Sequence, residues 1–249
     1  MKTIFIIPYR NRESELQLWL NKMIIILDKQ FNCININYED KPYEVIIIHQ
    51  KDDKLFNKGA CINTATQIIK KKYLNSKLKL SDITIIIHDV DIYITNSKVI
   101  EYKTNIGEVI NPYGPKPNTL GLIFGCIVIC NLQDYINING IPNYWGWGGE
   151  DICLAKRFKA HNIKINTDKF IERYTSNDII DPRHTISIKQ QKFQQITDKK
   201  NLRECFLENS LKSINGISNC SFQLLNEYYV NNYTQIKNVK MYDVLINII

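Results

Sequence analysis

Three short apolar segments rich in β-branched residues alternate with two helical repeats in the first part of the chain. The apolar segments are Thr3–Pro8, Glu44–His49 and Asp82–His88. Between them, Ser14–Leu27 and Lys58–Lys72 space their apolar residues as a helix with one buried face does. Strands that are apolar throughout are typical of parallel sheets covered by helices on both faces. The pattern predicts an α/β fold with a Rossmann-like, mostly parallel central sheet.

Polar residues follow these three segments, where a parallel sheet would present its binding edge. Arg10 comes after the first segment, Gln50 follows the second, and Asp89 and Asp91 follow the third. Open sheets of this kind bind ligands beyond the carboxyl ends of their strands. We therefore expect these side chains to line one site.

The remainder of the chain has weaker patterns. From apolar runs, helical spacing and proline and glycine content we expect a loop at Asn111–Pro117, a strand at Leu122–Cys130, a helix at Asp151–Ala160, an irregular segment at Phe170–Thr185, a helical segment at Lys189–Asn209 and a terminal strand at Tyr233–Val244. No repeat or linker interrupts the 249 residues, so we expect one domain.

Charge and cysteine usage limit the class of protein. The net charge of +7 is modest, and the one dense basic run, Lys70–Lys72, falls near a helix end, where cations suit the helix dipole. A polyanion patch is the less favoured reading, and we expect no nucleic-acid partner. Seven cysteines without a Cys-x-x-Cys pair indicate reduced thiols.

We expect no signal peptide or membrane anchor, because Met1 and Lys2 lead directly into the first apolar segment. We expect no transmembrane segment and a cytoplasmic location. The abundance of Ile, Asn and Lys indicates an AT-rich genome, so a low-GC organism or a large DNA virus is a possible source. For a virus, the location would be the host cytoplasm.

The segment Asn139–Asp151 combines four glycines, two tryptophans and a terminal Glu150-Asp151 pair. Glycine permits sharp turns and close approach of backbone to a ligand, and tryptophan offers a flat apolar face. A carboxylate pair can act as a general base or hold a hydroxyl-rich substrate. The combination predicts a carbohydrate site. A turn buried only for packing is the alternative, but it gives no reason for the acidic pair.

This segment resembles the Trp-Gly-Trp-Gly-Gly-Glu-Asp signature of the β-1,4-galactosyltransferase family, a glycosyltransferase family 7-like group. A weaker likeness to the family's Asp-Gly-Leu-Asn and final strand covers Asn215–Asn219 and Tyr233–Ile236. Other segments in the family's order are Ile7–Arg12, similar to Pro-Phe-Arg-Asn-Arg, Phe56–Ala60, similar to Phe-Asn-Arg-Ala, and His88–Asp91, which contains the Asp-Val-Asp metal motif.

The resemblance implies a GT-A-type single catalytic domain over residues 1–249. Residues 1–110 would form a nucleotide-binding half and residues 111–249 an acceptor-binding half. It also implies a metal-dependent, inverting enzyme that transfers a hexose, Gal or GalNAc, from a UDP-sugar to a glycan acceptor through a β-linkage. The chain would be a divergent soluble member of the family.

Positions that match residues of the family imply which side chains bind the UDP-sugar. Lys58 stands where the family has Arg, which keeps the charge but loses the bidentate fork. For Arg12 the alternative is a solvated residue in the first helical turn. The residues implied to contact the nucleotide-sugar are Pro8, Arg10, Arg12, Phe56 against the uracil, Lys58, Asp89 near the ribose, Ile123 and Trp147.

The resemblance implies a Mn²⁺ site, with Mg²⁺ possible, held by Asp91, His184 and Asp181. Asp181 occupies the place of a Met in the family's Met-x-x-His pattern, and a carboxylate there suits hard cations. The alternative is an exposed loop histidine at 184 and a turn that begins at Asp181.

Catalysis is assigned to the acidic pair. We expect Asp151 to be the general base and Glu150 to hold the acceptor or share that role, with Gly148 and Gly149 also in the acceptor site. Ile123 matches a Tyr beside the sugar's 2-substituent in galactose-transferring members, so a smaller residue leaves room for GalNAc. Its alternative is a strand core residue.

Two other functions stay open. A non-catalytic nucleotide-sugar or carbohydrate-binding protein on the same fold would explain the departures at Lys58, Ile152 and Asp181. A nucleotidyltransferase would need Asp-x-Asp but would leave the tryptophan and glycine loop unexplained.

Overall fold

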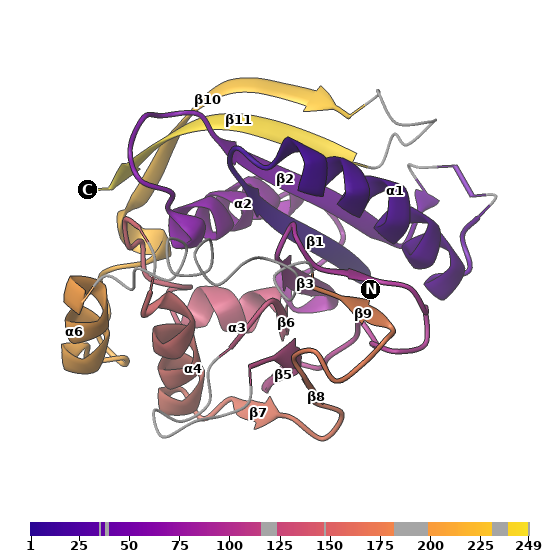
Figure 1. Cartoon of the computed structure of the whole chain (residues 1–249). Helices are drawn as coiled ribbons and strands as arrows, with labels where there is room; N and C mark the ends of the chain where they lie inside the picture. The colour runs from indigo at the N-terminus through magenta and orange to yellow at the C-terminus, as the bar shows by residue number, and fades with distance from the viewer. Residues whose placement is uncertain are drawn as a thin grey trace.

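A computed structural model describes residues 1–34, 36–37, 40–115, 124–146, 148–181, 199–230 and 239–248 of the chain. Within them lies one nine-stranded sheet (Figure 1). Its strands, in spatial order, are β10 (Cys220–Tyr229), β11 (Val239–Ile248), β2 (Tyr43–Gln50), β1 (Lys2–Tyr9), β3 (Ile83–His88), β6 (Ile127–Asn131), β5 (Glu108–Gly114) and β7 (Lys164–Asn166), while β8 (Ile171–Glu172) also pairs with β5.

The sheet is mixed around a parallel centre. Strands β11, β2, β1 and β3 run parallel, with Tyr9 beside His49 and Ile6 beside Ile87 in the register. Strand β6 runs antiparallel to both β3 and β5, and β10 runs antiparallel to β11. The carboxyl ends of β1, β2 and β3 therefore share an edge with the beginning of β6.

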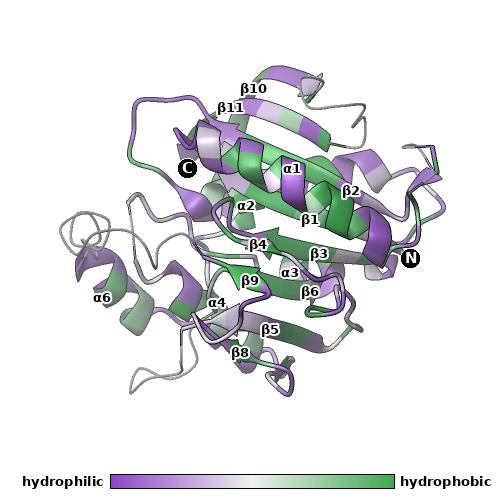
Figure 2. Cartoon of the chain, turned by 45° about the vertical axis from the view of Figure 1, so that its right-hand side comes forward, coloured by the Kyte–Doolittle hydropathy of each residue, from purple (hydrophilic) through white to green (hydrophobic). Residues whose placement is uncertain are grey.

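Helices cover both faces of this sheet (Figure 1). Helix α1 (Glu13–Gln30) packs on one face, and α2, α3 and α4 pack on the other. Figure 2 shows the central strands as mostly hydrophobic, which is what burial on both faces requires. The remaining bounds are α2 (Lys58–Tyr73), α3 (Leu132–Asn137), α4 (Glu150–Ala160), α6 (Lys199–Leu207), the 3-10 turns η2 (Leu80–Asp82) and η4 (Ile217–Asn219), and the paired strands β4 (Tyr93–Ile94) and β9 (Ile179–Ile180).

The predicted first five elements are all present within three residues of their expected bounds. The loop expected at Asn111–Pro117 is wrong, because strand β5 continues through Pro112 to Gly114. Pro112 lies where the pairing of β5 with β6 changes register, between Ile110 and Tyr113. Proline lacks an N–H and is tolerated at such irregularities.

Other differences arise where tertiary pairing creates short elements. Phe170–Thr185 was expected to be irregular, but it contains β8 and β9, each of which pairs with a distant strand. Strand β10 has a mostly exposed surface and therefore lacks the apolar signal of the central strands. The expected helical and terminal-strand segments include residues outside the described ranges, and α6 and β11 account for their described parts.

All seven cysteines are buried and free. In the ranges that the structure describes, every helix is too short or too polar to cross a bilayer.

Substitution of Gly140 tests how tightly the Asn139–Asp151 segment is packed. Gly140 has φ +64°, and an added Cβ would lie 2.9 Å from Ile217 and 3.0 Å from Tyr135 and would also meet the amide oxygen of Asn63. Left-handed strain and overpacking together predict that Gly140→Ala lowers the free energy of unfolding by about 3 kcal/mol. Urea denaturation measures this loss.

Gly107→Ala is the matched control, because Gly107 has φ +82° but an added Cβ would meet nothing within 4 Å. It should cost only about 1 kcal/mol, from backbone strain alone. Equal losses in the two variants would show that packing around Gly140 is not tight.

Candidate active site

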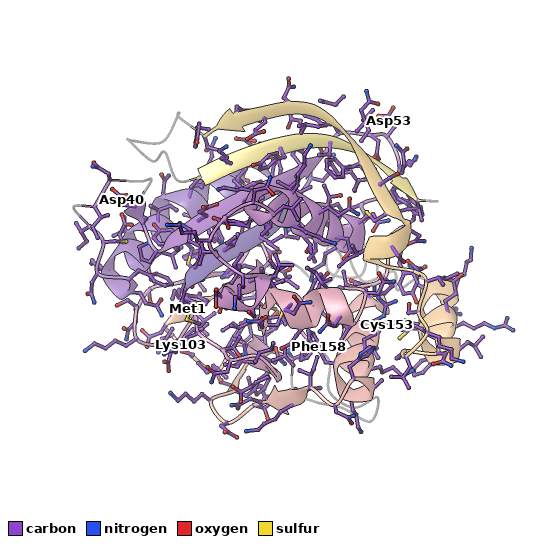
Figure 3. All side chains as sticks on the ribbon, turned by 180° about the vertical axis from the view of Figure 1, so that it is seen from behind. Met1, Asp40, Asp53, Lys103, Cys153 and Phe158 are labelled. Carbon is purple, nitrogen blue, oxygen red and sulfur yellow. The ribbon has the colours of Figure 1, made fainter. Side chains whose placement is uncertain are left out.

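Side chains from three strand ends meet at the carboxyl edge of the parallel strands. Arg10 and Arg12 follow β1, and the turn between them is made by Asn11 with φ +50°. Asp89 and Asp91 follow β3. Met1 and Asp53, which precede β1 and follow β2, lie on opposite sides of the view in Figure 3. Polar side chains therefore follow the carboxyl ends of the parallel strands, as the sequence predicted.

Arg12 links the first strand end to the third. Its Nη1 donates to Oδ2 of Asp91 at 2.9 Å, and the Asp91 side chain is nearly buried. Charge-assisted bonds of this kind are stronger than neutral ones. Arg12 is partly exposed, and its guanidinium holds the Asp-Val-Asp segment.

Gln50 organises the loop after β2. Its side-chain nitrogen donates to Oδ1 of Asp52 at 2.7 Å and to the Leu55 carbonyl at 3.0 Å, and its oxygen accepts the Asn57 N–H at 2.8 Å. Arg10 donates to the Lys54 carbonyl of the same loop. The loop is thereby fixed against the edge of the sheet.

The segment between α3 and α4 packs on the first turn of α2. Asn63 donates to the Ile141 carbonyl at 2.7 Å and to the Asn143 side chain at 2.8 Å, and it accepts from the Tyr135 hydroxyl. A Cβ at Gly59 would collide with the Pro142 carbonyl. These contacts bring the Asn139–Asp151 segment to the carboxyl edge of the parallel strands.

A buried cation holds the other side of this segment. Arg157, with no exposed surface, donates to the Gly140 carbonyl at 2.6 Å and to Glu208 at 2.7 Å through Nε. Burial lowers the pKa of Arg157 to about 10, so the guanidinium stays charged at neutral pH. Asn143 also donates to the Gly216 carbonyl at 2.6 Å. Glu208–Asn219 therefore clamp the segment from outside.

The acidic pair occupies the first turn of α4. Gly149, at φ +87°, precedes Glu150, and Glu150 accepts the Gly148 N–H at 2.9 Å through Oε2. Carboxylates are stabilised at a helix N-terminus by the helix dipole. Glu150 is buried, so its bond to Gly148 shapes the loop, whereas Asp151 is partly exposed.

Lys58 lies between carboxylates of both halves of the chain. Its ammonium is 3.1 Å from Oδ1 of Asp89 and 3.5 Å from Oδ1 of Asp151. Burial alone would lower the pKa of Lys58, but Asp151, Asp89 and Glu150 raise it, so Lys58 is charged. Burial raises the pKa of Asp151 to about 7, with Lys58 opposing and Glu150 adding to the rise.

Two further residues that were predicted to contact the nucleotide-sugar, Pro8 and Phe56, have backbone roles in the structure. Pro8 is buried beside Ile48 in the register with β2, past the last residue that β1 pairs with β3. Its missing N–H therefore leaves no gap in the described pairing with β3. The Phe56 carbonyl accepts the Gly146 N–H at 3.0 Å, which ties the two loops together.

Strand pairing directs two predicted metal ligands to one region. Asp91 precedes β4 and Asp181 follows β9, and these strands pair antiparallel with Tyr93 opposite Ile180. Asp181 is buried, lies 3.2 Å from Nε of Arg173, and accepts from the Tyr113 hydroxyl at 3.4 Å. Carboxylate oxygens fit Mn²⁺ or Mg²⁺. The described residues contain no group of three His, Cys, Asp or Glu suited to a metal.

Three predicted site residues lie outside the described ranges: Ile123, Trp147 and His184. The structure also shows residues that the sequence patterns did not indicate. Asn63 and Arg157 were missed because single buried polar residues carry no periodic signal. His49 forms a pair with Asp243 that no local spacing could reveal.

Two family models match successive parts of the chain. One, described as the N-terminal region of glycosyl transferase group 7, matches residues 1–103. The other, described as the N-terminal domain of galactosyltransferase, matches residues 109–179.

Sequence relatives include Beta-1,4-galactosyltransferase 1 of Homo sapiens, which is 28% identical over 167 residues. The match covers 66% of this chain and 38% of that protein. Human Beta-1,4-galactosyltransferase 4 is also 28% identical, over 170 residues, with 66% and 44% covered. The chain therefore spans less than half of the length of these relatives.

Solved structures of Drosophila β-1,4-galactosyltransferase 7 match over nearly the whole fold. A mutant complex with manganese, UDP-Gal and xylobiose has a TM-score of 0.68 and 18% identity. The catalytic domain in complex with xylobiose has a TM-score of 0.69 and 19% identity. Each match covers 99% of this chain and 94% of the other, which confirms the predicted GT-A-type fold.

The two family models follow one another along the sequence, and the match to the Drosophila structures covers 94% of each of those chains. The chain belongs to the β-1,4-galactosyltransferase family of glycosyltransferase group 7.

Proposed function

We propose that this protein is a metal-dependent inverting glycosyltransferase. It transfers Gal or GalNAc from a UDP-sugar to a glycan acceptor through a β-linkage. The observation that carries the proposal is the contact of Lys58 with both Asp89 and Asp151, which joins the nucleotide edge to the acidic pair. The family and the manganese, UDP-Gal and xylobiose bound by the Drosophila neighbour support it.

Asp151 serves as the general base. Its carboxylate accepts the proton of an acceptor hydroxyl while that oxygen attacks the anomeric carbon. The bond from this carbon to the diphosphate oxygen breaks, and UDP leaves with the bonding pair, which inverts the anomeric centre. A base with a pKa of about 7 is well matched to proton transfer near neutral pH.

Asp91, Asp181 and His184 are proposed to hold Mn²⁺ or Mg²⁺, with His184 outside the described residues. When bound, the ion neutralises charge on the leaving diphosphate. Arg10, Arg12 and Lys58 supply cationic groups at the same edge, with Arg12 already fixed to Asp91.

The acceptor is proposed to bind beside Gly148 and Gly149, with the Trp147 side chain against the sugars. Glu150 acts there through the loop that it holds at the Gly148 N–H. A cytoplasmic location remains a prediction, which the seven free cysteines support.

One assay of UDP release tests both which UDP-sugar the protein uses and whether it needs a metal. We expect acceptor-stimulated release of UDP from UDP-Gal or UDP-GalNAc with Mn²⁺, and loss of release in EDTA. GlcNAc, glucose and xylose glycosides serve as acceptors. Better use of UDP-GalNAc would support the role proposed for Ile123, whereas equal or better use of UDP-Gal would overturn it. UDP binding without release from any pair would favour the non-catalytic alternative.

Asp151→Asn should lower the transfer rate by at least about 100-fold, because the amide cannot accept the proton. UDP affinity, measured by calorimetry, should change little. Asp168→Asn is the matched control, since Asp168 is exposed on the loop after β7 and should retain full activity. Transfer by Asp151→Asn at a rate near that of the unchanged protein would remove Asp151 from the mechanism.

The pH dependence of kcat/KM follows from the same carboxylate. Asp151 must be ionised to act as a base, so kcat/KM should fall as the pH drops through about 7. Lys58 lowers the pKa of Asp151, so Lys58→Met should move this fall to higher pH, while Lys58→Arg should leave it nearly in place. A profile unchanged by Lys58→Met would contradict the coupling.

A further inference from the structure

A polar pocket lies at the carboxyl ends of β1 and β2, on the side of the N-terminus of α1. Its volume is about 430 Å³, within the range of small-ligand sites. Tyr9, Arg10, Glu13, His49 and Lys51 are among its lining residues. The proposed chemistry uses none of these groups except Arg10, so the role of the others is open.

His49 is held rigidly in the wall of this pocket. Its Nδ1 lies 3.0 Å from Oδ1 of Asp243, which is buried on β11 directly beside His49 in the sheet register. The Tyr9 ring packs edge-on against the imidazole, with 4.6 Å between ring centroids. Asn226 donates to the other oxygen of Asp243 at 3.3 Å, which fixes the carboxylate in turn.

This arrangement determines the tautomer. A carboxylate oxygen only accepts hydrogen bonds, so the proton of a neutral His49 is on Nδ1 and Nε2 is an acceptor. Burial and the nearby Lys51 lower the pKa of His49, which favours the neutral ring. In the described part of the chain Nε2 bonds to no other group, although it is not sealed from solvent.

We infer that the His49–Asp243 pair selects a uracil base through the N–H of its imide edge. Uracil presents one N–H between two carbonyl oxygens, which suits an acceptor with donors on either side. His49, Arg10 and Lys51 all line the pocket, so a base bound there would meet Nε2 of His49 as an acceptor and the Arg10 and Lys51 side chains as donors. This inference rests on the proposed use of a UDP-sugar and adds the residues that choose its base.

Cytosine shows why the tautomer matters. Its ring nitrogen at the same position is an acceptor, so two acceptors would face each other across the contact. A site built around one hydrogen bond rejects a ligand that lacks the matching group, because a polar atom is left unpaired. Asp243 does not touch the base, and acts by holding the proton on Nδ1 of His49.

Binding of UDP and CDP to the full chain with Mn²⁺, measured by calorimetry, tests the inference. The unchanged protein should bind UDP at least about tenfold more tightly than CDP. His49→Ala should weaken UDP binding about tenfold and bring the two affinities together. His161→Ala, at the C-terminal end of α4, is the control and should behave as the unchanged protein.

The Asp243→Asn variant distinguishes control of the His49 tautomer from a purely structural role of Asp243. An amide can donate to Nδ1, which moves the imidazole proton to Nε2 and makes it a donor. The preference should then shift toward CDP in a variant whose thermal midpoint shows that it is folded.

Discrimination against CDP that survives both His49→Ala and Asp243→Asn would overturn this inference alone. Tighter binding of GDP than UDP by the unchanged protein would overturn the assignment to uracil. If the unchanged protein binds none of these nucleotides, the proposed function fails and this inference fails with it.

Discussion

The direct contact between the start of helix α2 and the segment after α3 determines where the chemistry lies. Gly59 has no side chain, so the Pro142 carbonyl can approach the helix closely. Lys58, one residue earlier, is thereby placed beside Asp151. A larger residue at 59 would separate the two halves of the site. The position of Asp151 relative to the carboxyl edge of the parallel strands thus depends on this backbone contact.

Buried charge is used here in two different ways. Arg157 is surrounded by carbonyl oxygens and Glu208, so its charge is compensated and its loss would leave those acceptors unpaired. Lys58 is shared between Asp89 and Asp151, so that neither carboxylate is satisfied by it alone. The first arrangement favours a rigid loop, and the second makes the pKa of Asp151 depend on the charge of Lys58.

Periodicity predicted β1, α1, β2, α2 and β3 because each buries a continuous apolar face. It failed at Pro112, where a change in register allowed a proline inside a strand, and in β10, whose exposed surface lacks an apolar pattern. Motifs indicated a set of candidate site residues. They could not predict their pairing, since His49 and Asp243 are 194 positions apart and only the sheet register joins them.

The reversed direction of β6 has a consequence for how such a site can vary. Because β6 begins where β3 ends, the Cys126 carbonyl accepts the Asp89 N–H at 2.9 Å, and the backbone of the second half borders the Asp-Val-Asp segment. The binding edge is thus supplied by chain leaving the sheet and by chain entering it. Changes in length or composition just before β6 can therefore alter the site while the register of the parallel strands stays the same.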